Sequence, residues 1–79
     1  MAVDLERLPA GRQLAVRRLV LGVTQAVVAE RLGLPSERIS EAERESPYRS
    51  ARALQLLQGQ IDGVLQELER ERQTPAEVS

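Results

Sequence analysis

The chain has 79 residues, of which 42% are hydrophobic and 29% are charged. A chain this short forms one domain and buries only about 60% of the surface that it exposes when unfolded, so we expect a marginal core. The sequence has no Cys and no His, which excludes disulfides, thiolate or imidazole metal sites, and catalysis by either side chain. We therefore expect a binding protein that is not an enzyme and holds no metal or cofactor.

The sequence contains no apolar run near the roughly 18 residues that a membrane span needs. The first residues, MAVDLERLP, lack the basic and then apolar layout of a secretory signal. We therefore expect a cytoplasmic protein that does not bind membranes.

The net charge of −1 hides an asymmetry along the chain. Residues 1–52 carry nine Arg against seven acidic residues, a net charge of +2, whereas residues 53–79 carry two Arg against five acidic residues, a net charge of −3. All eleven basic residues are Arg, which suits bidentate contacts to phosphate or guanine but is equally consistent with the codon usage of a GC-rich genome.

Two short helices are predicted near the N-terminus. Apolar residues recur at roughly helical spacing after Pro9, and Gly22 follows the run as a glycine that ends a helix. Thr24 is a suitable N-cap for a second helix of about two turns, which Gly33 ends.

A third helix is predicted from Pro35 to Arg44, because proline suits a first helical turn and Ser36 suits a cap. Ile39 and Ala42 are the only apolar residues that follow. One narrow face is therefore expected to be buried, and the remaining side chains are expected to face outward.

A long helix of roughly 24 residues is predicted from about Arg49 to Arg72. Its aliphatic residues alternate steps of three and four positions, as in the seam of a coiled coil. This stripe either covers the first three helices or joins two copies of the chain, and its width favours dimerisation. Gly59 and Gly63 either break the helix in two or let a partner backbone come close. The expected dimer seam consists of Leu54, Leu57, Ile61, Val64 and Leu68.

The stretch from Gly11 to Glu43 contains a ladder of residues at fixed spacing. It has Gly11, Leu14 and Arg18, then GVTQ at 22–25, then VAERLGL at 28–34, and finally Ile39, Ser40 and Glu43. It resembles the helix-turn-helix of the phage-repressor-like (Cro/lambda-repressor, or Xre) family of DNA-binding proteins. With this resemblance, we expect a helix-turn-helix region over residues 1–46, a dimerisation helix over 47–72 and a flexible tail over 73–79.

The resemblance also implies roles for individual residues. The third helix would enter the major groove of double-stranded DNA, while the start of the second would contact phosphate. Arg18 and Glu43 match the ion pair that holds the first helix against the third. The expected DNA-binding residues are Thr24, Gln25, Ser36, Glu37, Arg38, Ser40, Glu41 and Arg44.

The sequence departs from the family pattern at several positions. Arg17 stands where an apolar residue is usual, and Glu45 replaces the glycine expected after the third helix. The third helix is also acidic, and its glutamates would repel phosphates unless arginines pair with them. The acidic residues concerned are Glu37, Glu41, Glu43 and Glu45.

The function predicted from these features is a sequence-specific transcriptional regulator, a repressor that binds operator DNA as a homodimer at the nucleoid. The alternative is a protein-interaction adaptor or anti-factor, whose acidic third helix binds a basic partner. Recognition of RNA or single strands is disfavoured, because Tyr48 is the only aromatic residue and provides no stacking platform.

Overall fold

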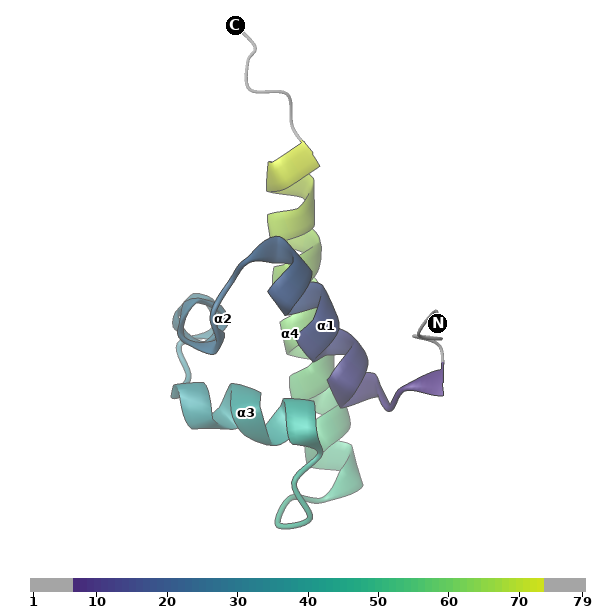
Figure 1. Cartoon of the computed structure of the whole chain (residues 1–79). Coiled ribbons are helices and arrows are strands. Elements are labelled where there is room, and N and C mark those ends of the chain that lie inside the picture. The colour runs from purple at the N-terminus through teal and green to yellow at the C-terminus, as the bar shows by residue number, and fades with distance from the viewer. Residues whose placement is uncertain (1–6, 74–79) are drawn as a thin grey trace, which may run out of the picture.

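Four α-helices make up most of residues 7–73, the part of the chain that the structure, a computed structural model, describes (Figure 1). They are α1 (Ala10–Leu21), α2 (Gln25–Leu32), α3 (Ser36–Arg44) and α4 (Ala51–Gln73). The predicted all-α fold with a long last helix is confirmed. In Figure 1, α1 crosses in front of α4, and α2 and α3 lie to one side.

Local sequence signals set the ends of the first two helices. Gly22 and Gly33 follow α1 and α2 in the left-handed conformation, with φ of 73° and 69°, which a glycine adopts without a steric penalty. The side chain of Thr24 accepts a hydrogen bond of 3.2 Å from the N–H of Val27 at the start of α2. These ends agree with the sequence prediction.

The hydrophobic core draws on all four helices. Ile39 of α3 and Ile61 of α4 are both completely buried, together with Val28 of α2. Because α4 contributes nearly half of the core residues, the first three helices do not bury their apolar faces without it. The core residues are Leu14, Val28, Ala29, Ile39, Ala42, Leu57, Ile61, Val64 and Leu65.

The expected dimer seam of α4 lies mostly inside the single chain. Leu57, Ile61 and Val64 are core residues, and Leu54 and Leu68 are half-buried. The prediction that Leu57, Ile61 and Val64 face a second chain is therefore wrong. The helical repeat indicated correctly that this face is buried, but α1, α2 and α3 of the same chain cover it.

The helix α4 also continues without a break through its two glycines. Gly59 and Gly63 lie within the 23 residues of α4, and both are exposed. The predicted alternative of two separate helices is therefore wrong.

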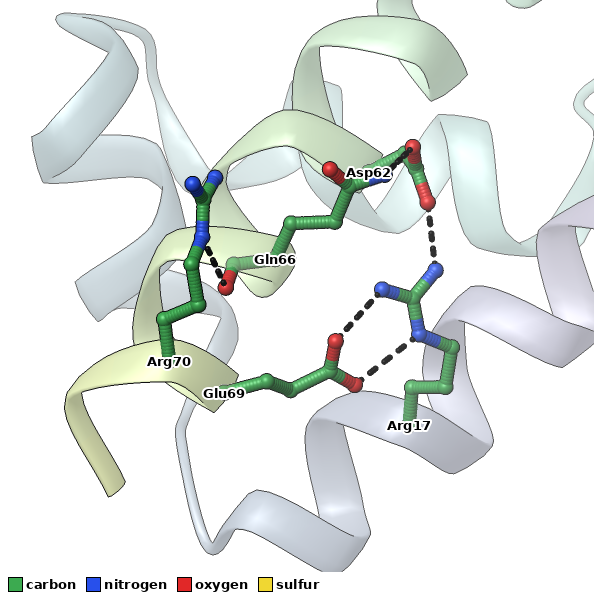
Figure 2. Close-up of polar contacts among 5 residues, drawn as sticks. All are labelled: Arg17, Asp62, Gln66, Glu69 and Arg70. Atoms are coloured by element: carbon green, nitrogen blue, oxygen red, sulfur yellow. Dashed lines mark hydrogen bonds and ion pairs between the residues drawn. The ribbon is translucent and has the colours of Figure 1, made fainter. Parts of the chain in front are cut away.

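Charged side chains join α1 to the C-terminal half of α4 (Figure 2). The guanidinium of Arg17 donates hydrogen bonds of 3.1 and 2.9 Å to the carboxylate of Glu69 and another to Asp62. Gln66 also donates to Asp62, and Arg70 donates to the carbonyl oxygen of Gln66. The hydrogen bond with Glu69 raises the pKa of Arg17, and the same bond lowers the pKa of Glu69.

This network explains why Arg17 stands where an apolar residue was expected. The face of α4 opposite Arg17 presents carboxylates, so a cation at this position stabilises the contact between α1 and α4.

No helix within residues 7–73 is long and apolar enough to cross a membrane. The tail predicted from position 73 lies outside the described residues from position 74 onward, and Gln73 is the last residue of α4.

Candidate nucleic-acid interface

The inner face of α3 is fixed by a buried ion pair. Arg18 of α1 donates from Nε to Oε2 of Glu43 at 2.7 Å and from Nη2 to Oε1 at 3.2 Å. The side chains of Arg18 and Glu43 are only 11% and 8% exposed. The predicted pair is therefore present, and it holds α3 against α1. Arg18 also donates to the carbonyl oxygen of Val23, which ties the pair to the loop before α2.

The same carboxylate connects α3 to α2. The side-chain amide of Gln25 donates a hydrogen bond of 3.0 Å to Oε1 of Glu43. Three helices thus meet at one carboxylate, and the orientation of α3 relative to α1 and α2 is set by directional bonds. Gln25 therefore acts as a support for α3.

The C-terminal end of α3 lies directly against the start of α1. A Cβ atom on Gly11 would collide with the backbone carbonyl oxygens of Ala42 and Glu43, so only glycine fits there. Glu45 follows α3 with a φ of 53°, a left-handed conformation that costs a non-glycine residue roughly 1–2 kcal/mol. Its carboxylate accepts a hydrogen bond of 2.9 Å from the N–H of Gly11. An acidic group at a helix N-terminus is favourable, which offsets part of this cost.

Sequence reasoning missed this role of Glu45. The available signal was the acidic residue that stands in place of the expected glycine, because only a specific contact would keep glutamate in that conformation.

The outer face of α3 is exposed. Arg44 extends over this face and donates a hydrogen bond of 2.7 Å to the hydroxyl of Ser40. Ser36, Glu37, Arg38 and Arg44 are exposed, while Ser40 and Glu41 are partly exposed.

Most of the glutamates of α3 and its C-cap form ion pairs or hydrogen bonds with other residues of the protein. Glu43 pairs with Arg18, Glu45 accepts from α1, and Glu41 forms an ion pair of 2.9 Å with Arg49. Glu37 is the exception, because its side chain has no hydrogen bond or ion pair with any residue from 7 to 73. Arginines thus compensate the charges of Glu41 and Glu43, whereas Glu37 and Glu45 keep uncompensated negative charges.

The starts of α2 and α3 border a shallow hollow of about 670 Å³. Thr24, Gln25 and Ser36 all line it, so these three predicted site residues come together. Within the described part of the chain, the N–H groups of Gln25 and Ala26 have no hydrogen-bond partner, as is usual in a first helical turn. The hollow thus meets the positive end of α2, which favours an anion.

Arg38 lies apart from this hollow. It lines a second hollow of about 210 Å³, between α3 and α4, together with Arg49 and Leu56. The eight predicted contact residues therefore do not form one patch, and Arg38 lies on the flank of α3 that faces α4.

Residues 7–73 contain no group of three or more acidic side chains that could hold a metal ion. Comparison with protein families, curated proteins and solved structures gives no match to this chain. The functional assignment therefore depends on the geometry of α2 and α3.

Proposed function

We propose that this chain is a transcriptional regulator that binds operator DNA, with α2 and α3 as its helix-turn-helix and α3 in the major groove. One observation carries the proposal. The helix α3 is fixed through its inner face by Glu43 and Arg18, while its outer face remains open to solvent. A short helix held rigidly with one polar face exposed is suited to read base edges.

The expected contacts with DNA are of two kinds: contacts to phosphates position the protein, and contacts to base edges read the sequence. The start of α2 borders the larger hollow with Thr24 and Gln25, and its unbonded N–H groups suit a phosphate oxygen. Ser40 and Arg44 present a hydroxyl and a guanidinium on the outer face of α3. An arginine there is able to form two hydrogen bonds with a guanine. Glu37, which is exposed on α3, would accept from a cytosine amino group.

The electrostatics favour DNA over a basic protein partner. The adaptor alternative needs an acidic third helix, but Glu41 and Glu43 pair with Arg49 and Arg18. The exposed charges that remain on α3 include Arg38 and Arg44 against Glu37, which is a mixed surface. The proposal includes repression as a homodimer, because two linked helices on one operator bind far more tightly than one.

The proposal is tested by selecting sites from a random duplex library and measuring affinity by fluorescence polarisation at several salt concentrations. Wild-type affinity should fall steeply as salt rises. Arg44→Ala should weaken binding to the selected site by roughly 1–3 kcal/mol.

The matched control is Arg72→Ala, which removes the same charge from the last turn of α4, where Arg72 donates a hydrogen bond to the carbonyl oxygen of Val20. That end of α4 lies away from α3 (Figure 1). This variant should bind almost as the wild type does. Absence of duplex binding even at low salt would contradict the proposal and favour the adaptor. Equal losses in the two variants would show that α3 does not read the site.

A further inference from the structure

The outer face of α4 carries Leu56, a large aliphatic side chain at the edge of the hollow between α3 and α4 that residues 7–73 leave largely uncovered. Leu56 is 66% exposed, although its neighbour Leu57 is in the core. Helical spacing of three and four positions places other exposed residues on the same side of α4 as Leu56. We call this set the outer stripe, and it consists of Arg52, Leu56, Gly59, Gly63 and Glu67.

The charges at the two ends of the outer stripe have no partner within the described residues. Arg52 and Glu67 are both exposed, and neither side chain forms a hydrogen bond or an ion pair with any residue from 7 to 73. They lie fifteen positions apart, about 22 Å along the helix. The stripe therefore has a positive end and a negative end, with Leu56 and the glycines between them.

The two glycines of the outer stripe are not required by packing within the chain. A Cβ atom on Gly59 or Gly63 would meet no atom within 4 Å, so packing inside the chain does not require glycine at either position. Each costs about 1 kcal/mol relative to alanine in a helix interior. The flat surface that they leave beside Leu56 would accommodate an approaching side chain.

We propose that the outer stripe docks on the outer stripe of a second copy of this chain, with the two α4 helices antiparallel. A two-fold axis between Gly59 and Gln60 makes the contact self-complementary. In this register Leu56 faces Gly63 of the second copy, and Arg52 faces Glu67 of the second copy. Each contact occurs twice in the dimer.

The charge pattern of the outer stripe favours a second copy of the chain as the partner, and it favours the antiparallel orientation of the two α4 helices. A parallel pair would place Arg52 against Arg52 and Glu67 against Glu67, which is repulsive at both ends, whereas the antiparallel pair is attractive at both ends. A contact between two single helices is small, so the free protein should dimerise in the micromolar range. The inference rests on the proposed function, because it supplies a surface for the homodimer. Dimerisation of the free protein is nevertheless measured without DNA.

The test is analytical ultracentrifugation of the full chain over a wide range of concentrations. The wild type should pass from monomer to dimer as its concentration rises. Arg52→Glu and Glu67→Arg should each weaken the dimer at least about tenfold, because each change places two pairs of like charges in contact. The double variant, with both changes, should recover most of the lost affinity.

Control variants carry the same charge changes away from the stripe. Arg12→Glu on α1 and Glu30→Arg on α2 alter exposed residues, and both should dimerise as the wild type does. Gly63→Leu should block the approach of Leu56 from the second copy while circular dichroism shows the helices intact.

Three results would overturn the inference. They are a wild type that stays monomeric at every concentration, a dimer that neither charge reversal weakens, and single variants that the double variant does not rescue. A monomer that still binds its selected duplex would refute this surface and leave the proposed DNA binding standing, without the homodimer. A dimer that the charge reversals weaken but that binds no DNA would support this surface and refute the proposed function.

Discussion

Arg18 of α1 and Glu43 of α3, which are 25 positions apart in the sequence, form a bidentate and almost completely buried ion pair. The pair fixes the face of α3 that points inward and therefore also the face that points outward. Because both groups are shielded from water, removal of one leaves a buried charge without its partner.

Arg18→Ala and Glu43→Ala should each lower the free energy of unfolding by roughly 3–5 kcal/mol, because the remaining charge is uncompensated. The measurement is urea denaturation followed by circular dichroism. The double variant Arg18→Met with Glu43→Leu should be less destabilised than either alanine variant. If the double variant Arg18→Ala with Glu43→Ala lost the sum of the two single losses, a direct interaction between the two side chains would be contradicted.

Ile61 and Leu56 lie on the same helix, but only Ile61 belongs to the core. Ile61→Ala should cost roughly 2–5 kcal/mol, because it leaves a cavity among closely packed side chains. Leu56→Ala should change the stability of dilute protein by less than about 0.5 kcal/mol, since an exposed side chain loses little packing. Similar losses in the two variants would mean that α4 does not bury the face described above.

Gly11 and Gly59 are both helical glycines with opposite surroundings. Gly11→Ala should destabilise the protein by about 1–3 kcal/mol, since its Cβ meets backbone that does not move aside easily. Gly59→Ala should stabilise dilute protein by up to about 1 kcal/mol, because it gains helix propensity without a collision. Thermal unfolding monitored by circular dichroism measures both changes. An increase in melting temperature for Gly11→Ala would refute the close contact between α1 and α3.

The hydrogen bonds from Arg17 make stability depend on pH through Glu69, whose pKa they lower from its ordinary value of 4.5. A carboxylate with a lowered pKa stabilises the folded state above its ordinary pKa, and this contribution is lost as pH falls through the lowered value. Glu69→Gln should therefore be less stable than the wild type near neutral pH. The difference should not exceed about 1 kcal/mol, because both side chains are about one-third exposed.

The measurement is the urea midpoint of the wild type and Glu69→Gln at a series of pH values from about 7 down to about 3. The two midpoints should converge as the solution becomes acidic. Glu71→Gln is the control, because it removes a more exposed carboxylate of the same helix, one that lies 3.5 Å from Arg31. A difference for Glu69→Gln that stays constant with pH would contradict the assigned ion pair.

Local signals in the sequence were enough to place the helices. Gly22, Gly33 and Thr24 end or begin helices through their own backbone conformation or a hydrogen bond three residues away, and such effects do not depend on the rest of the fold. The ion pair between Arg18 and Glu43 was predictable only through the family resemblance, because nothing local links residues on separate helices.

Only the tertiary structure decided what covers each surface. The repeat in α4 indicated an apolar face, but it carries no information about whether the same chain or another covers Ile61. Similarly, Arg17 bonds to Glu69, which is 52 positions away in the sequence, and Glu45 bonds to Gly11, which is 34 positions away. Helix crossings bring each pair together. Helix formation is decided locally by backbone geometry and hydrogen bonds, whereas burial and charge pairing are decided by which faces meet.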